Sequence, residues 1–449
     1  MKIKLDDLAI DKDDPFKNCL FNREKYADIL NKVISNYNKN IVMAVNSEWG
    51  TGKSTFLRMW QQKLTNTGFL TVYFNAWEND FEDEPLTALL GELSAIQPSS
   101  KKNFDKVLDV AKNFAIEFLP AAAKGIAKKY ISEDAIDIVE SGLDGSSALV
   151  KKLLVDYSVK KVSLIKFREE IGKVIKNLSP NRPLVFFIDE LDRCRPNYAV
   201  SILEKIKHFF NVSNIIFVLA IDKEQLSHSV CGVYNSEKIN SKEYLRRFID
   251  IEYSMPNDSK ENYVKYLINY YQINEDLQNN DKHFRTKEED QFYHLIWNLF
   301  HGFNLRKLEK TLGLIKLSLI SVNSEKIYPE IHLLLIYLKL EKPDLYNKIL
   351  KKKFSMSEFY KELNDLTSFY LKLEVGIEIL EFHAIMMICY GNYLSPTALN
   401  EFIHSAVAEV QSLIQSFKNL QPIYGHQCLN ANLETFIYRI EITNDFNIA

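Results

Sequence analysis

The chain has 449 residues, which is too many for one ordinary domain, so we expect two or three. Its hydrophobic share of 46% and its charged share of 26% are typical of a soluble globular protein. A formal net charge of −3 gives no overall electrostatic case for binding nucleic acid or an anionic membrane.

The cysteines and the apolar runs narrow the class of protein further. The five cysteines are scattered and lack the spacing of a zinc site, which predicts reduced thiols in a cytoplasmic protein. The first residues lack the apolar core of a signal peptide, and no run of 18 apolar residues is present. We therefore expect no membrane span.

Residues 20–34 contain apolar residues at helical spacing, and Arg23 is the distinctive residue of this stretch. Two interpretations of Arg23 stay open. It is either a solvated arginine at the start of a helix, or part of the pocket around the base and sugar of the ligand that the next stretch predicts.

Residues 41–60 predict a phosphate-binding loop. An apolar run over 41–45 indicates a buried strand, a Gly-Lys-Ser loop follows, and residues 56–64 continue as a helix. Loop amides and the positive end of a helix suit an anionic phosphate. Ser47 stands where the first glycine of the G-x-x-x-x-G-K-[ST] motif belongs. The residues predicted to bind a nucleoside triphosphate are Glu48, Trp49, Gly50, Thr51, Gly52, Lys53, Ser54 and Thr55, with Lys53 on the β/γ-phosphates and Ser54 on Mg²⁺.

After this loop the pattern predicts a strand over 69–74 and a helix after Pro85. We interpret Trp77, which follows the strand, as a packing residue. Residues 98–178 form a predicted helical insertion, and in the long helix predicted over 149–178 the lysines between 151 and 176 outnumber the acids. A solvated face is the default interpretation, and contact with nucleic acid or a partner is the alternative.

Residues 183–193 are the second informative stretch. A continuous apolar run indicates a parallel strand buried on both faces, and it ends in acids, where such a sheet presents its strand ends to ligand. Asp189 is placed to hold Mg²⁺, directly or through water. Glu190 is the predicted catalytic glutamate that polarises the attacking water.

Two more strand ends carry candidate residues. Asp222 follows a predicted strand over 214–221, and it either orients the attacking water or senses the γ-phosphate, or it caps the next helix. Arg247 lies where a helix end runs into the last predicted strand. It either stabilises the charge on a transferring γ-phosphoryl group, in its own or a neighbouring subunit, or forms a structural salt bridge.

From residue 259 onward the pattern is helical to the end. Arg306 lies near the start of a predicted helix over 302–319. We expect it to face the nucleotide from a helical lid.

These motifs together resemble the KAP family of P-loop NTPases over roughly residues 14–320. The resemblance rests on residues 48–54, 74–77, 188–196 and 244–249. It implies an α/β fold of the ASCE type with a parallel sheet ordered 5-1-4-3-2, a helical lid and an all-α C-terminal region. The implied domains are a KAP-type P-loop NTPase domain at 1–258 with the helical insertion at about 98–178, a lid at 259–322 and an α-helical C-terminal domain at 323–449.

The resemblance also implies roles for single residues. Asn22 stands where the nucleotide-pocket motif of such proteins usually has a glycine, next to Arg23. Asp222 looks like a first sensor, Arg247 like an arginine finger and Arg306 like a second sensor. Residues 98–150 occupy the place of the transmembrane helices of many members but lack their hydrophobicity.

Three functional hypotheses follow. The first is an ATPase that depends on Mg²⁺ and works as an oligomeric switch or motor, with partner proteins in bacterial antiphage or plasmid-exclusion defence as the resemblance implies. The second is a nucleotide-gated scaffold with little turnover. Ser47 and Asn22, which stand in place of glycines, hint at such impaired nucleotide handling. The third is an ATP-driven machine that binds nucleic acid.

Overall fold

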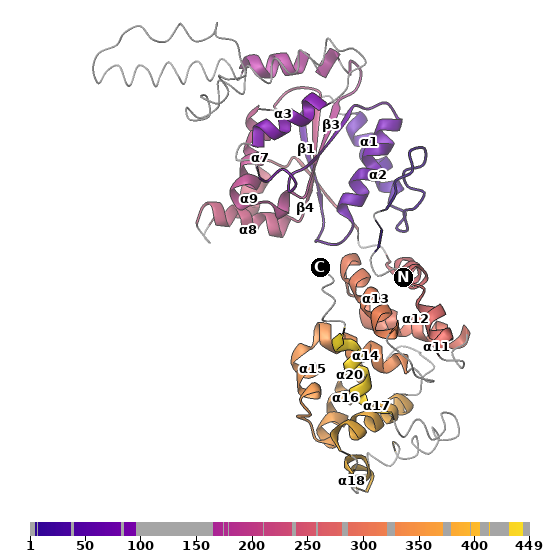
Figure 1. Ribbon diagram of the computed structural model, residues 1–449. Coiled ribbons are helices and arrows are strands. Elements are labelled where there is room, and N and C mark those ends of the chain that lie inside the picture. Colours follow the sequence, from indigo (N-terminus) through magenta and orange to yellow (C-terminus); the bar gives the residue numbers. More distant parts are fainter. Residues whose placement is uncertain are drawn as a thin grey trace. The chain divides into compact units, whose positions relative to one another are not determined.

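The computed structural model describes residues 5–6, 8–36, 40–81, 85–95, 165–173, 175–177, 179–209, 211–235, 239–256, 259–280, 286–320, 328–370, 379–395, 397–404, 413 and 431–442. The chain divides into an α/β unit, Leu8–Asn257, and a helical unit made of Met1–Asp7 and Asp258–Ala449. Each unit is described by itself below (Figure 1).

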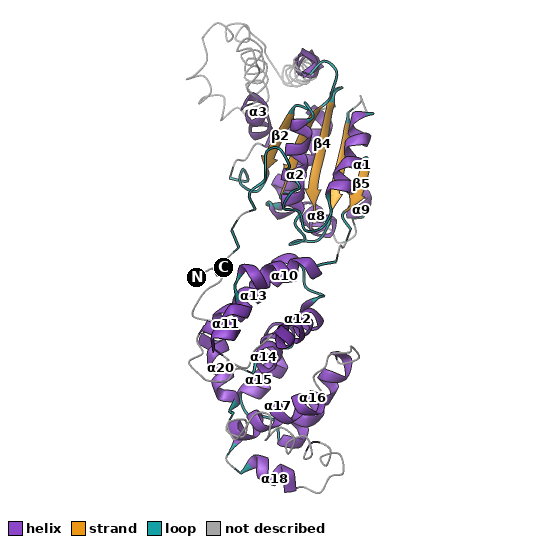
Figure 2. Cartoon of the chain, turned by 90° about the vertical axis from the view of Figure 1, so that its right-hand side faces the viewer, coloured by secondary structure: helices purple, strands orange, loops and turns teal. Residues whose placement is uncertain are grey.

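The α/β unit is organised around one sheet of five parallel strands in the order β2-β3-β4-β1-β5. Figure 2 shows these strands in orange. Read from the other edge the order is 5-1-4-3-2, so the predicted sheet is confirmed. The strands are β1 (Ile41–Asn46), β2 (Thr71–Asn75), β3 (Leu184–Asp189), β4 (Ile215–Ile221) and β5 (Ile251–Ser254).

The central strands β3 and β4 are apolar up to Asp189, the last residue of β3, because helices cover both faces of the sheet. Every residue of β3 and β4 is buried. Successive side chains of a strand point to opposite faces, so Phe186 and Phe217 belong to one core and Phe187 and Val218 to the other. The indole of Trp60 packs edge-on against Phe187, with ring centroids 5.3 Å apart.

Helices on the two faces come from different parts of the chain (Figure 1). The helices α1 (Glu24–Ser35) and α2 (Lys53–Asn66) cover one face. The helices α3 (Pro85–Ala95), α7 (Pro196–Phe209) and α8 (Lys223–Val233) cover the other. Two short helical segments complete the unit: the 3-10 turn η3 (Leu191–Arg193) and α9 (Ser241–Arg246).

The carboxyl edge of the sheet collects the segments that the sequence singles out. The phosphate loop follows β1, η3 follows β3, and α8 follows β4 directly. In an open α/β sheet of parallel strands this edge is where ligands bind. The fold therefore brings the two principal motifs together at one end of the sheet.

The described part of the second unit is all helical, as predicted. Its helices are α10 (Glu261–Tyr270), α11 (Ile273–Asn280), α12 (Thr286–Phe300), α13 (Leu305–Ile320), α14 (Pro329–Glu341), α15 (Pro343–Leu350), α16 (Met356–Tyr370), α17 (Ile379–Leu394), α18 (Ala398–His404) and α20 (Leu433–Ile442). The division of this unit into a lid at 259–322 and a C-terminal domain at 323–449 stays a prediction.

Three further expectations concern the insertion, membrane spans and Trp77. Most of the predicted insertion at 98–178 lies outside the described residues, apart from 165–173 and 175–177. Among the helices that the structure describes, none has the length and apolarity needed to cross a membrane. Trp77 is 55% exposed, so its interpretation as a packing residue within this chain is wrong.

Candidate functional site

The backbone of the phosphate loop has the conformation that its glycines permit. Gly50 has a φ of 77° and Gly52 a φ of 86°, both in the left-handed region that side chains disfavour. Ser47, by contrast, does not have a positive φ. The serine at the first glycine position therefore introduces no backbone strain of this kind. The hydroxyl of Thr51 donates to the Glu48 carbonyl at 2.8 Å and closes the loop.

Lys53 is the first residue of α2, and its side chain turns back over the loop. Its ammonium group donates hydrogen bonds to the carbonyl oxygens of Ser47 and Glu48, the latter at 3.1 Å. The residue is only 8% exposed. Burial lowers the pKa of this lysine, while the carboxylates of Asp192, Asp222 and Asp189 oppose the shift. A buried cation thus lies against carbonyl oxygens of the phosphate loop.

The two residues predicted to hold magnesium lie on neighbouring elements. Ser54 is the second residue of α2, and Asp189 is the last residue of β3, only 2% exposed. Hydroxyl and carboxylate oxygens are donors that Mg²⁺ accepts. Within the described residues no three histidine, cysteine or acidic side chains are grouped to hold a metal. This sparse oxygen set fits a magnesium ion that takes its other ligands from phosphates and water.

Tyr73 orients the Asp189 carboxylate, a contact that the sequence did not suggest. Its hydroxyl, on β2, donates a hydrogen bond to Oδ2 of Asp189, and the backbone N–H of Glu190 donates to Oδ1 at 2.8 Å. The guanidinium of Arg58, on α2, lies 5.3 Å from the centre of the Tyr73 ring. Burial first, and then Asp189, raises the pKa of Tyr73, so it stays a donor. The aspartate is held in one orientation.

Glu190 lies beside Asp189 but its carboxylate is paired with Arg193. Nη1 of Arg193 lies 2.6 Å from Oε1 of Glu190. Glu190 has a φ of 58°, an uncommon conformation for a residue other than glycine, and such positions concentrate at functional sites. Burial raises the pKa of Glu190 and Arg193 opposes the shift. A carboxylate with a raised pKa is suited to accept a proton from water.

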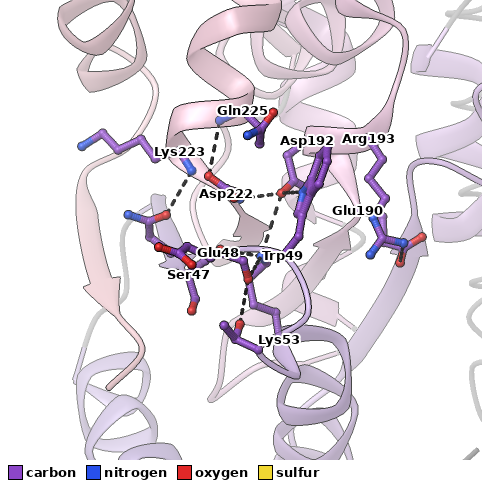
Figure 3. Close-up of polar contacts among 12 residues, drawn as sticks. Ser47, Glu48, Trp49, Lys53, Glu190, Asp192, Arg193, Asp222, Lys223 and Gln225 are labelled. Carbon is purple, nitrogen blue, oxygen red and sulfur yellow. Dashed lines mark hydrogen bonds and ion pairs between the residues drawn. The ribbon is translucent and has the colours of Figure 1, made fainter. Parts of the chain in front are cut away.

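Asp192 joins the loop to the end of β4, and sequence reasoning did not assign it a role. Its Oδ2 accepts hydrogen bonds from the Trp49 indole N–H at 2.8 Å and from the Asp222 backbone N–H at 2.6 Å. The same oxygen lies 3.9 Å from Nζ of Lys53. Figure 3 shows the carboxylate between these groups. The only sequence signal was a third acid three residues after Asp189.

Asp222 caps α8. Its Oδ1 accepts from the backbone N–H groups of Glu224 at 3.2 Å and Gln225 at 3.3 Å. An aspartate at the N-cap satisfies amides that the helix leaves free. The structure thus shows Asp222 as a helix cap, and its role as a sensor of the γ-phosphate stays a prediction.

Arg23 contacts the phosphate loop from the N-cap position of α1. Its Nη2 donates to the Thr51 carbonyl at 3.0 Å and its Nη1 to the Gly52 carbonyl at 3.5 Å. The residue is 7% exposed, which excludes the solvated interpretation. Asn22, before it, has a φ of 48°, the conformation for which related motifs use glycine. The Arg23 guanidinium therefore contacts the loop backbone, and it also lies 4.6 Å from the centre of the Phe21 ring.

Arg247 and Arg306 are the remaining two candidate arginines. Arg247 follows α9, is exposed, and has no ion pair with any residue that the structure describes. Its backbone carbonyl accepts from the Lys207 ammonium group. Arg306 is the second residue of α13 in the helical unit and is exposed. Their roles as arginine finger and second sensor stay predictions.

Comparisons with known structures give low scores. Drosophila ORC bound to DNA is 11% identical, with 96% of this chain and 88% of that chain covered and a TM-score of 0.35. The Aeropyrum pernix ORC2 protein in ADPNP-ADP complexes is 13% identical, with 96% and 87% covered and a TM-score of 0.31. AMPPCP-bound DnaA from Aquifex aeolicus is 11% identical, with 95% of each covered and a TM-score of 0.28. At such scores none supports a conclusion about this chain.

No curated protein was found to match the chain. A family model does match it: the model described as the KAP family P-loop domain covers residues 23–318, about two thirds of the 449 residues. The match spans the phosphate loop, the end of β3, the helices α10 to α12 and most of α13. The chain belongs to the KAP family of nucleotide-binding P-loop NTPases.

Proposed function

We propose that this chain binds ATP with Mg²⁺ and hydrolyses it at the carboxyl edge of the sheet. The observation that carries the proposal is the arrangement of Lys53 and the phosphate loop beside a strand that ends in Asp189 and Glu190. Lys53 would bind the β- and γ-phosphates, and Ser54 and Asp189 would hold the metal. Mg²⁺, when bound, supplies positive charge beside those phosphates. The choice of ATP over GTP rests on the family alone.

In this proposal Glu190 accepts a proton from the attacking water. Its partly buried position and raised pKa favour proton acceptance, but its carboxylate is paired with Arg193. Asp222 holds α8 through its cap, so any sensing of the γ-phosphate would act through that helix end. Ser47 and Asn22 fit their backbone conformations, which weakens the case for a scaffold with impaired nucleotide handling.

Arg247 favours an oligomer. The phosphate loop follows the carboxyl end of β1, whereas Arg247 precedes the amino end of β5, and the two strands are parallel. About five residues of strand, or roughly 17 Å, separate the two levels of the sheet. An arginine finger at this position would reach the nucleotide of a neighbouring subunit more readily than its own. We therefore propose a homo-oligomer in which Arg247 acts in trans.

The first test is phosphate release from Mg-ATP by the purified protein and by Lys53→Ala, with Mg-GTP as a second substrate. Lys63→Ala is the matched control, because Lys63 lies on the same helix but pairs with Glu24 at 2.8 Å and Asp28 at 2.6 Å. Loss of turnover in Lys53→Ala, with turnover kept in Lys63→Ala, supports the proposal. ATP-dependent assembly without any phosphate release would favour the scaffold.

A mixing experiment tests the trans arginine. Arg247→Ala and Lys53→Ala are each expected to be inactive. When they are mixed, some interfaces combine an intact Lys53 site with an intact Arg247 from the neighbour, so phosphate release should recover in part. No recovery in mixed assemblies would contradict action in trans. The control is Arg246→Ala, since Arg246 pairs with Glu243 at 3.0 Å on its own helix.

The biological setting follows from the family and not from the site. We propose a cytoplasmic protein that acts with partner proteins in phage or plasmid exclusion, and the described free cysteines fit a reducing compartment. Phage plating on cells that carry the wild type or Lys53→Ala tests the role. Added DNA or RNA in the phosphate assay tests the nucleic-acid alternative, which predicts stimulation that salt suppresses steeply.

A further inference from the structure

One carboxylate oxygen of Asp192 serves three groups at once. Oδ2 lies 2.8 Å from the Trp49 indole nitrogen, 2.6 Å from the Asp222 backbone nitrogen and 3.9 Å from the Lys53 ammonium nitrogen (Figure 3). The Asp192 side chain is only 1% exposed. The proposed roles of Asp189 and Glu190 do not use this carboxylate, so its position needs its own explanation.

The charges of Asp192 and Lys53 depend on each other. Burial lowers the pKa of Lys53, and Asp192 is the largest opposing influence. Burial raises the pKa of Asp192, and Lys53 is again the largest opposing influence. Two charges removed from water in this way are tolerated because each offsets the other.

The geometry allows the Lys53 side chain to move away from Asp192. At 3.9 Å its nitrogen makes no short hydrogen bond to Asp192, and its protons are directed to the carbonyls of Ser47 and Glu48. Asp192, by contrast, is fixed by two N–H donors from separate elements. A competing anion can therefore draw the lysine away while the carboxylate stays in place.

We propose that Asp192 is the resting counter-ion of Lys53, a positioning residue with which the nucleotide phosphates compete for the lysine. This inference rests on the proposed function, because it requires phosphates to bind at this loop. Asp192 thereby limits the affinity for β- and γ-phosphates. The hydrogen bond that Trp49 donates to Asp192 sets how strongly the carboxylate of Asp192 attracts Lys53.

Two substitutions have opposite expected effects. Asp192→Asn keeps an oxygen that accepts from Trp49 and Asp222 but removes the charge, so ATP and ADP should bind about tenfold more tightly, or by about 1.4 kcal/mol. AMP, which lacks the distal phosphates, should be unaffected. Trp49→Phe removes a donor from Asp192, so Lys53 is held more strongly and ATP should bind several-fold more weakly. In the double variant the effect of Trp49→Phe should disappear.

The experiment is calorimetric titration of the full chain with ATP, ADP and AMP in EDTA, which removes any effect at the metal ligands. Glu224→Gln is the matched control, since it removes one exposed carboxylate that pairs with Lys242. Tighter ATP and ADP binding in Asp192→Asn, with unchanged AMP binding, supports the inference.

Unchanged or weaker ATP binding in Asp192→Asn overturns the inference, as does an undiminished effect of Trp49→Phe in the double variant. If Asp192→Asn does not fold, Trp49→Phe still decides, because unchanged ATP binding in that variant also overturns the inference. A wild type that fails to bind ATP would overturn the proposed function as well. The two failures are therefore distinguishable.

Discussion

The Tyr73 hydroxyl donates a hydrogen bond to Oδ2 of Asp189, across the register that sets β2 beside β3. The other oxygen of Asp189 accepts from the backbone of Glu190. Both carboxylate oxygens therefore have fixed donors, and the remaining lone pairs point in defined directions. Partners of this kind orient metal ligands, and their loss commonly weakens metal binding.

Tyr73→Phe should weaken Mg²⁺ binding about tenfold. Without the phenol the Asp189 carboxylate is free to rotate, while the phosphate loop is untouched. Mn²⁺ binding to the ATP-loaded protein, followed by electron paramagnetic resonance, measures this directly. Metal-free ATP affinity should be unchanged. Tyr26→Phe, which removes a hydroxyl from α1 of the same unit, is the control, and equal Mn²⁺ affinity in both variants would refute the role of Tyr73.

Arg193→Met should move the acid limb of the rate profile to higher pH. Arg193 opposes the burial that raises the pKa of Glu190, so its removal raises that pKa further. Because the base must be ionised to accept a proton, activity is then lost at a higher pH as the solution is acidified. The measurement is kcat against pH. Arg246→Met, which breaks a similar pair with Glu243, should leave the profile in place.

Arg23→Met should weaken ATP binding about tenfold, since two donors to the loop carbonyls are lost. The ligand series separates the two roles considered for Arg23. If Arg23 braces the loop, tripolyphosphate should lose affinity as much as ATP does. If it contacts the base and sugar, tripolyphosphate binding should be unaffected, and adenosine should carry the loss.

His332→Phe should make the helical unit more resistant to acid. Burial, and then Arg439, lowers the pKa of His332 from 6.5 to about 3. Between these values the unfolded chain binds a proton that the folded chain does not, so stability falls as pH falls, by about 1.4 kcal/mol per pH unit. Urea unfolding at pH 7 and pH 5 should show a smaller loss in the variant. The exposed His404→Phe is the control, and equal losses would contradict the account.

The fold could be predicted because burial on both faces leaves a plain pattern. The apolar runs over 41–45 and 214–221 and the run that ends at Asp189 each became a strand. The phosphate loop is also readable, because its backbone conformation requires glycine at two positions. The sheet order came from the family resemblance, since no local pattern in the chain encodes which strands pair.

The contacts around the site could not be predicted, because they depend on register and side-chain direction. Tyr73 reaches Asp189 only because β2 and β3 pair in one register. Among the three acids at 189–192, no pattern indicates that Asp192, and not Glu190, lies against Lys53. The sequence favoured packing over chemistry for Trp77, yet its side chain is 55% exposed.

The most direct measurement of the central claim compares Glu190→Gln with the wild type in ATP binding and single-turnover phosphate release. The amide keeps the size of the side chain but cannot accept the proton. We predict ATP affinity close to that of the wild type and a rate of phosphate release about 10²–10⁴-fold lower. An undiminished rate in Glu190→Gln would show that Glu190 is not the base and would contradict this account of the site.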